Sequence, residues 1–285
     1  MDIFIKVLLV KDRMDYKVTI SIDGTRKIDF QEGHTAVIIP TVNEKHAVCV
    51  SCQVGCPVGC KFCHTGKMGL KRNLTADEIV NQIIVAKSVI GSNPTTVVFM
   101  GMGEPLLNLN AVLAAAERMH KEFQLAYNHI TISTSCLPTM NRLLDIPFNV
   151  ALSIHSPFDE TRKRLMPPTI LIKDIISFAQ EYCQKHPRKE LMVEYALMKG
   201  INDRDEDIKA LLALPWPKKT LFNFIQYNDL GEFKRSDDLH LHNFKQAAIA
   251  AGFKSFVRLS RGPDIAAACG MLDAPQVKFL SSATK

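Results

Sequence analysis

Three cysteines lie close together in the segment QVGCPVGCKFC, at Cys56, Cys60 and Cys63. Thiolates are ligands both for zinc and for iron–sulfur clusters. A closed structural zinc site takes four protein ligands, whereas three cysteines in the spacing CxxxCxxC leave one iron of a cubane cluster without a protein ligand. The spacing therefore favours a [4Fe-4S] cluster whose free iron can bind a small molecule.

A zinc site that takes its fourth ligand from a neighbouring residue is the alternative. Cys49, Cys52 and His64 all lie close enough in the sequence to supply such a ligand. His64, however, directly follows Cys63, which is a poor position from which to reach the same metal. We therefore favour the cluster over zinc.

An aromatic residue, Phe62, stands just before the third cysteine and completes the pattern CxxxCxφC, in which φ is aromatic. With this pattern the segment resembles the radical S-adenosylmethionine enzymes. The resemblance implies that the methionine part of S-adenosylmethionine binds the free iron, and that an electron from the cluster then releases a 5′-deoxyadenosyl radical. The protein would position and shield the reactants, because the cofactor supplies the difficult chemistry.

Composition is that of an ordinary globular protein with unusual cysteine usage. The chain has 285 residues, a formal net charge of +6, 47% hydrophobic residues and eight cysteines. Five of these cysteines lie between Cys49 and Cys63, which points to metal or redox use rather than a disulfide framework. The apolar run in MDIFIKVLLVKDR is too short for a signal peptide or a membrane span, so we expect a cytoplasmic protein with no membrane partner.

Basic residues cluster near the cysteines and after a later strand, although the net charge alone fits an ordinary surface equally well. They are Lys61, Lys67, Lys71 and Arg72, followed by Arg162, Lys163 and Arg164. If both groups lie on one rim, we expect them to contact phosphates.

Strand and helix patterns alternate along most of the chain. Strands are expected at 46–51, 95–101, 129–135, 149–155, 190–198 and 220–227, with a last one at 255–260. Helices are expected at 76–90, 110–122, 172–186, 204–213 and 238–251, the first with Thr75 as N-cap, Glu78 completing a capping box and Gly91 as stop. This alternation predicts an α/β fold with a partial (β/α)6 barrel, because a closed eight-stranded barrel needs more chain.

The first 45 residues show a different pattern. IFIKVLLV and YKVTISI are separated by KDRMD and followed by an Asp-Gly turn, which predicts a small antiparallel β unit. We therefore expect two regions, an N-terminal β-rich extension at 1–45 and a core barrel with a C-terminal cysteine segment at 46–285.

Polar residues follow several of the expected strands, where the active sites of such barrels gather. Gly103 and Glu104 lie in the turn MGEP, Ser133 ends the next strand, and His155 ends the one after it. Taken alone, GEP is an ordinary strand-to-helix turn and a lone histidine is more often structural. Beside the cysteine motif, these residues become candidates for binding the cofactor.

Longer segments carry a more specific resemblance. They are CVSCQVGCPVGCKFCHTGKMGLKRNLTADEIVNQ, FMGMGEPLLNLN, ITISTS, LSIHSPFDETR, FIQYN and RGPDIAAACGML. In this order, from about residue 33 to the end, the chain resembles the RlmN and Cfr family of radical methyltransferases, which methylate adenine in RNA. The resemblance implies that Cys56, Cys60 and Cys63 hold a [4Fe-4S] cluster. It assigns contacts with S-adenosyl-L-methionine to Gly103, Glu104, Ser133, Ser153, Ile154, His155 and Asn228.

Two further cysteines acquire roles from the same resemblance. Cys269 matches the residue that is methylated as an intermediate, and Cys49 matches the residue that resolves the covalent adduct through a transient disulfide. Carbon 2 of adenine is not nucleophilic, so a radical on the thiomethyl group has to attack it. We expect Cys49 to be accessible and to have a low pKa. Cys52, Cys136 and Cys183 receive no role.

The expected substrate is an adenine ring carbon of ribosomal or transfer RNA, with carbon 2 favoured over carbon 8. An external electron donor and a disulfide reductant are implied as partners. The family's helical RNA-binding domain has no match in the first 45 residues, and its proton-accepting glutamate falls near Thr35, with Glu32 and His34 as nearby substitutes. Two alternatives therefore stay open, the same chemistry on a nucleotide or other non-RNA substrate, and a non-catalytic RNA-binding protein that carries a cluster.

Overall fold

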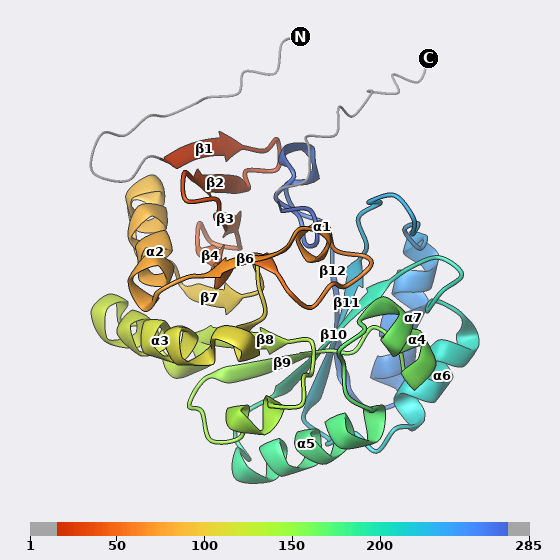
Figure 1. The fold of residues 1–285 in the computed structure, drawn as a ribbon. Coiled ribbons are helices and arrows are strands. Elements are labelled where there is room, and N and C mark those ends of the chain that lie inside the picture. Colours follow the sequence, from red (N-terminus) through yellow and green to blue (C-terminus); the bar gives the residue numbers. More distant parts are fainter. Residues whose placement is uncertain (1–15, 273–285) are drawn as a thin grey trace, which may run out of the picture.

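The chain folds around one curved sheet. The structure is a computed structural model that describes residues 16–272. Within these residues ten strands form the sheet, in the order β1-β2-β3-β4-β7-β8-β9-β10-β11-β12 (Figure 1). The parallel strands are β4 (His46–Cys49), β7 (Thr96–Phe99), β8 (Ile130–Thr134), β9 (Asn149–Ser153), β10 (Leu191–Leu197), β11 (Thr220–Gln226) and β12 (Lys254–Arg258). The predicted α/β fold with a partial barrel is confirmed, and β12 occupies the position of the expected last strand.

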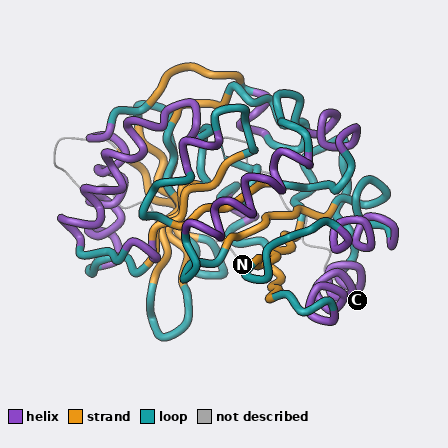
Figure 2. Tube along the Cα trace, turned by 90° about the horizontal axis from the view of Figure 1, so that it is seen from below, coloured by secondary structure: helices purple, strands orange, loops and turns teal. Residues whose placement is uncertain are grey.

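Helices connect the parallel strands and flank the sheet, whose strands gather in the interior (Figure 2). The helices are α1 (His64–Lys67), α2 (Ala76–Ile90), α3 (Leu109–Phe123), α4 (Asp159–Leu165), α5 (Ile172–Lys185), α6 (Asp205–Ala213) and α7 (Asp238–Ala250). Parallel neighbours require such crossovers, because the chain must return to the same end of the sheet before the next strand begins. The five helices expected from the sequence are α2, α3, α5, α6 and α7. Across residues 16–272, none of the helices has the length and apolar character needed to cross a bilayer.

Helix α2 begins and ends where its sequence predicts. The Thr75 hydroxyl accepts a hydrogen bond from the Glu78 N–H, and the Glu78 carboxylate accepts one from the Thr75 N–H at 2.8 Å. This capping box satisfies two N–H groups that would otherwise lack partners at the helix start. At the other end Gly91 adopts a left-handed conformation, with φ of 77°, which ends the helix.

The N-terminal strands are antiparallel and continue the same sheet. They are β1 (Tyr16–Ile20), β2 (Arg26–Phe30) and β3 (Thr35–Pro40), and β3 pairs antiparallel with β4. The antiparallel arrangement is as predicted, whereas the segment IFIKVLLV lies outside the described residues. Strands β3 and β4 lie on either side of residue 45 and pair directly with each other. The division of the chain into two regions at this residue stays a prediction.

The two faces of this N-terminal part of the sheet have different partners. Ile38 and Val48 point into the main core together with residues of α2. Val37 and Cys49, which pair with each other in the sheet, pack instead against Leu272 in the C-terminal segment 262–272. Alternation along a strand places successive side chains on opposite faces, so this register aims Cys49 at the C-terminal segment.

The turn between β1 and β2 anchors the C-terminal segment. The Asp264 carboxylate accepts hydrogen bonds from the Ser21 hydroxyl at 2.6 Å and from the Ile22 N–H at 3.2 Å. In return, the Gly262 N–H donates to the Asp23 carboxylate at 3.0 Å. These contacts between residues more than two hundred positions apart hold the segment that carries Cys269.

A hairpin that the sequence does not predict frames the cysteine loop, which we define as residues 56–63. Strands β5 (Gln53–Cys56) and β6 (Gly69–Asn73) form a separate two-stranded sheet, with the cysteine loop and α1 between them. The hairpin is irregular at Gly55, where a Cβ atom would lie 1.9 Å from the Gly69 carbonyl oxygen. Only glycine fits this close approach. Gly55 also has a φ of 75°, which side chains other than that of glycine rarely allow.

Candidate active site

A cavity opens at the C-terminal ends of the parallel strands, beside the cysteine loop. It is lined by ten of the residues singled out in the sequence, namely Cys56, Cys60, Phe62, Cys63, Gly103, Glu104, Ser133, Ser153, His155 and Cys269. Ile154 is fully buried and does not line the cavity, and its N–H donates to the Glu194 carbonyl at 3.0 Å. Asn228 lines a second, smaller cavity next to the first. The structure thus gathers residues from the ends of β7, β8 and β9, from the cysteine loop and from the C-terminal segment around one space.

The three cysteines of the cysteine loop form a desolvated group of thiols. Burial raises the pKa of Cys56 to about 12, and it also raises the pKa of Cys60 and Cys63, each of which lies near a neighbouring cysteine of the loop or Cys269. Such thiols stay protonated unless a cation holds them as thiolates. In the part of the chain that is described, no three His, Cys, Asp or Glu side chains converge as one metal ion would require. Each thiolate of a cubane cluster binds its own iron, and the three thiols of the cysteine loop provide the donors for such a cluster.

Close backbone contacts fix the cysteine loop. The Lys61 N–H donates to the Leu165 carbonyl at the end of α4, at 2.9 Å, and the His64 N–H donates to the Gly270 carbonyl at 2.8 Å. A Cβ atom at Gly66 would lie 2.9 Å from both the backbone nitrogen and the backbone oxygen of Cys60. The loop is therefore held by α1, α4 and the C-terminal segment together.

Gln82 on α2 fixes the chain just before the cysteine loop. Its side-chain amide accepts from the Ser51 N–H and donates to the Ser51 carbonyl, both at 2.8 Å. The Ser51 hydroxyl in turn donates to the Thr35 carbonyl and accepts from the Met102 N–H at 2.9 Å. This buried network joins β3, α2 and the turn after β7, and leaves its polar groups paired.

Glu104 is a buried carboxylate held in one orientation. Its oxygens accept from the Ser135 N–H and hydroxyl, both at 2.8 Å, and from the Leu106 N–H at 3.1 Å. Burial raises its pKa, while the hydrogen bonds from Ser135 and Leu106 act in the opposite direction. Gly103 has a φ of 102°, and a Cβ atom there would lie 2.7 Å from the Gln53 side chain. The sequence analysis missed Ser135, which lines the cavity together with the predicted Ser133.

His155 is buried with a defined tautomer. Its Nδ1 accepts a hydrogen bond from the Ala196 N–H at 2.9 Å, so the proton of the neutral ring is on Nε2. Burial lowers its pKa to about 3, with a further contribution from the charge of Arg162. The ring meets Phe62 edge to face, with centroids 4.9 Å apart. His155 thus offers one N–H donor beside the aromatic residue of the cysteine motif.

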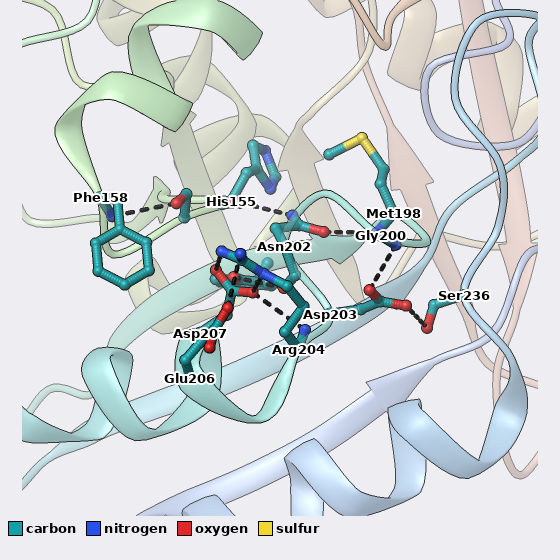
Figure 3. Close-up of polar contacts among 12 residues, drawn as sticks. His155, Phe158, Met198, Gly200, Asn202, Asp203, Arg204, Glu206, Asp207 and Ser236 are labelled. Carbon is teal, nitrogen blue, oxygen red and sulfur yellow. Dashed lines mark hydrogen bonds and ion pairs between the residues drawn. The ribbon is translucent and has the colours of Figure 1, made fainter.

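A polar network after β10 supports His155 (Figure 3). The Asn202 side chain donates to the His155 carbonyl at 2.6 Å and accepts from the Met198 N–H at 2.7 Å. The neighbouring Asp203 accepts from the Gly200 N–H at 2.7 Å and from the Ser236 hydroxyl at 2.6 Å (Figure 3). These bonds fix the loop that holds the histidine, whose φ of 54° is unusual for a residue other than glycine.

Cys269 lies in the wall between the two cavities. The residues that line both are Met100, Ile225, Gln226, Arg258 and Cys269. Cys49 lines the second cavity, so the wall separates it from the cysteine loop. Cys49 is buried, and this burial raises its pKa to about 12. The expectation of an accessible Cys49 with a low pKa is therefore wrong.

Two charged residues of the first cavity were missed from the sequence. Glu194 on β10 accepts from the Asn223 amide at 2.9 and 3.1 Å, and burial raises its pKa. Arg258 on β12 lies close enough to Cys269, Glu194 and Cys49 for their charges to raise its pKa. A glutamate inside the apolar run ELMVEYALM was the available signal for Glu194.

The predicted basic rim is wrong for Arg162 and stays a prediction for its other residues. Lys61, Lys67, Lys71, Lys163 and Arg164 are exposed, and Arg72 pairs with Glu78 at 2.8 Å. Arg162, however, is fully buried and cannot contact a phosphate at the surface. Arg162 lies on the inward face of helix α4, whereas Lys163 and Arg164 lie on its outward face.

None of the residues considered as proton acceptors lines either cavity. The Thr35 hydroxyl donates to the Asp29 carboxylate at 3.0 Å, and Glu32 is exposed. His34 is buried and stacks on Phe30, with ring centroids 4.4 Å apart. Of the cysteines without a role, Cys52 and Cys136 are buried and Cys183 is half-buried.

The barrel, the cysteine loop and the cavity between them define a radical S-adenosylmethionine enzyme. In agreement, the sequence model of the Radical SAM superfamily matches residues 50–212. A probable dual-specificity RNA methyltransferase RlmN from Thermosynechococcus vestitus is 38% identical over 266 residues, which are 90% of this chain and 78% of the relative. The dual-specificity RNA methyltransferase RlmN from Syntrophobacter fumaroxidans is 40% identical over 88% of this chain and 77% of its own length.

A solved structure agrees with these relatives. A radical SAM methyltransferase from Sphaerobacter thermophilus superposes with a TM-score of 0.81 at 34% identity, covering 93% of this chain and 80% of that one. The chain therefore belongs to the RlmN-type family of radical SAM methyltransferases.

Proposed function

We propose that this protein methylates an adenine ring carbon in ribosomal or transfer RNA, through a methyl group carried on Cys269. The observation that supports this most directly is the position of Cys269 in the wall between two cavities. On one side lie the cysteine loop and Glu104, and on the other lies Cys49. A sulfur atom in this position can receive a methyl group on the first side and meet a resolving thiol on the second.

Cys56, Cys60 and Cys63 would hold the [4Fe-4S] cluster. Binding to its irons would keep these three desolvated cysteines as thiolates, although burial raises their pKa. When bound, the cluster and S-adenosylmethionine supply a methyl group and a 5′-deoxyadenosyl radical. Glu104 is oriented to accept a hydrogen bond from the cofactor's amino group, and Gly103 lets the backbone approach closely. His155 would donate from Nε2, with Ser133 and Ser153 as further hydroxyl partners in the same cavity. The roles of Ile154 and Asn228 as cofactor contacts stay predictions.

Cys269 would act first as a nucleophile. Its thiolate takes the methyl group by displacement, and loss of a hydrogen atom from the resulting thiomethyl group gives a carbon radical that adds to the adenine ring. After the ring loses an electron and a proton, the Cys49 thiolate attacks the Cys269 sulfur. The carbon–sulfur bond to the product then breaks, the methylene carbon keeps the electron pair and takes up a proton to become the methyl group, and a disulfide forms between the two cysteines. An external thiol reductant returns this disulfide to two thiols.

The buried state of Cys49 suits a resolving residue that acts only at the end. A protonated thiol with a pKa raised to about 12 does not compete with Cys269 for the methyl group. Attack on the adduct requires Cys49 to lose its proton, and a shift of the segment 262–272, which packs against Cys49, would expose this thiol once the adduct has formed. The hydrogen bonds of that segment to Ser21, Ile22 and Asp23 are the contacts that such a shift would change.

RNA is favoured as the substrate by the names of the two relatives, both of which are RNA methyltransferases. Exposed lysines at Lys61, Lys67 and Lys71 could contact the phosphate backbone beside the cysteine loop. Carbon 2 is favoured over carbon 8 as the methylated position, as expected from the sequence.

The proposal is tested by incubating the reconstituted protein with reductant, S-adenosylmethionine and total RNA from a strain that lacks the protein. Nucleoside mass spectrometry should then detect 2-methyladenosine. Methyl transfer to small molecules and not to RNA would contradict the RNA substrate, and consumption of the cofactor without any methyl transfer would contradict the methyltransferase assignment. The Cys269→Ala variant is the matched control and should give no product.

A further inference from the structure

One buried cation beside the site has no role in the proposed chemistry. Arg162 on α4 is fully buried, and its guanidinium donates to the carbonyls of Ser153 and Ile154 and to the Thr169 hydroxyl. Its Nε, also buried, has no hydrogen-bond partner among the described residues. These oxygens are neutral, and the remaining partner of the guanidinium is the side chain of Cys136.

No described acidic side chain forms an ion pair with Arg162 within 4 Å. Asp159, on the same helix, accepts from the Ile172 N–H at 2.7 Å, and its charge acts on Arg162 only from beyond ion-pair distance. The adjacent Cys136 is a neutral thiol, because burial raises its pKa to about 12. A buried charge without a counter-ion is strongly unfavourable, and proteins normally provide such a charge with an anion.

The end of helix α4 lies directly on the cysteine loop. The Leu165 carbonyl accepts from the Lys61 N–H at 2.9 Å, and Leu165 and Met166 pack against Cys60 and Phe62. Arg162 lies one turn before Leu165. After Cys136 and Asp159, Cys60 is the third group whose charge acts on its guanidinium. The unpaired cation and the three cysteines therefore lie on the same side of the barrel.

We propose that Arg162 is the buried counter-ion of the iron–sulfur cluster and favours its reduced form. The inference rests on the cluster assignment of the proposed function. Three thiolates around the cluster make the loop anionic, which provides the missing counter-charge. Reduction transfers one electron from an external one-electron donor to the cluster, with no bond formed or broken, and makes the loop one unit more negative. A positive charge fixed nearby stabilises that product more than the oxidised form.

A purely structural role is the alternative. In that case Arg162 serves only to tie the end of β9 to Thr169, and its charge is incidental. Lysine in place of arginine separates the two accounts, because it keeps the charge but loses the forked set of donors. Arg164 provides the matched control, since it lies on the same helix but is exposed, so solvent screens its charge.

The test is a reductive titration of the holoprotein without S-adenosylmethionine, followed by electron paramagnetic resonance of the reduced cluster. At a given potential, Arg162→Met should lower the ratio of reduced to oxidised cluster at least tenfold, which equals a shift of ~59 mV for one electron. Arg162→Lys should stay within about threefold of the wild type, and Arg164→Met should not change the ratio. A ratio in Arg162→Met within about twofold of the wild type would overturn the inference.

Thermal unfolding gives a second readout that does not depend on activity. Cluster loading should raise the unfolding midpoint less in Arg162→Met than in the wild type, whereas Arg162→Lys should keep most of the increase. If cluster loading raised the unfolding midpoint of Arg162→Met and of Arg162→Lys by the same amount, the result would favour the structural role and contradict the role as a counter-ion. If Arg162→Met takes up no cluster, loading of Arg162→Lys supports the inference and failure of both variants overturns it. A wild-type protein that binds no cluster would instead refute the proposed function itself.

Discussion

The side-chain amide of Asn228 donates a hydrogen bond to the carbonyl oxygen of Cys269 at 3.1 Å. Asn228 is itself held by the Ser260 hydroxyl, which donates to its side-chain oxygen at 2.5 Å. The chain after β11 and the C-terminal segment are thus joined at the residue proposed to carry the methyl group. The position of Cys269 in the wall between the cavities depends on this contact as well as on the bonds of Asp264.

Replacing Asn228 with alanine should slow methylation of Cys269. A hydrogen bond of this kind contributes about 1 kcal/mol, so we expect a loss of roughly fivefold in the rate. Mass spectrometry of the Cys269 peptide over time measures this rate directly. Gln180→Ala, which removes a hydrogen bond to Pro215 on the outside of the barrel, is the control and should leave the rate unchanged. An unchanged rate in Asn228→Ala would show that the contact does not position Cys269.

Replacing Cys49 with alanine should trap the RNA on the protein. Without a thiol to attack the Cys269 sulfur, the carbon–sulfur bond to the methylated base cannot be broken by disulfide formation. Denaturing gel electrophoresis should show a covalent protein–RNA adduct, and peptide mapping should place it at Cys269. Cys183→Ala, which removes a half-buried thiol on α5, should form no adduct. Normal turnover by Cys49→Ala would contradict the resolving role.

Replacing Glu104 with glutamine should weaken binding of S-adenosylmethionine. Glutamine keeps the shape of the side chain but loses the charge that strengthens a hydrogen bond to an ammonium group, an effect of about 1.5–3 kcal/mol. We therefore expect a Kd roughly tenfold to a hundredfold higher, measured by calorimetry on the cluster-loaded protein. The exposed Glu122→Gln is the control. If the two variants bind the cofactor equally well, Glu104 has a structural role only.

The buried His155 should make the protein less stable in acid. Its pKa is lowered to about 3, so the unfolded chain takes up a proton at this residue below about pH 6.5 while the folded protein does not. The stability linked to the neutral ring is fully present above pH 6.5 and is lost as the pH falls toward 3, by about 1.4 kcal/mol per pH unit.

Asparagine is the informative substitution for His155, because it tolerates the positive φ at this position and cannot titrate. Urea unfolding of His155→Asn at pH 7 and pH 5 should show a smaller difference in unfolding free energy than the wild type shows. An identical pH dependence in both proteins would mean that His155 does not contribute.

Local signals explain which parts of the fold the sequence predicts. Helix α2 carries its own start and stop in Thr75, Glu78 and Gly91, and the parallel strands are short runs rich in apolar and β-branched residues. The β5–β6 hairpin depends instead on a bulge at Gly55 and on pairing across the cysteine loop. Helix α4 is short and has no side-chain N-cap, so its pattern is weak.

The residues of the site likewise fall into those that local sequence patterns predict and those that only the tertiary structure reveals. The motif cysteines and the turn at Glu104 can be read from residue type and spacing, because the chemistry requires those residues near each other in the sequence. Arg258, Glu194 and the buried Arg162 reach the site only through sheet register and helix rotation. The burial of Cys49 follows from packing by a segment more than two hundred residues away, which no local pattern reveals.

The central claim is that the methyl group passes through Cys269, and isotope labelling tests it most directly. The protein is first methylated on Cys269 with S-adenosylmethionine that carries a trideuterated methyl group, and then turned over once on RNA with unlabelled cofactor. The account predicts a methyladenosine that retains two of the three deuterium atoms, and 5′-deoxyadenosine that carries the third. An RNA product without deuterium, or one that retains all three atoms, would contradict it.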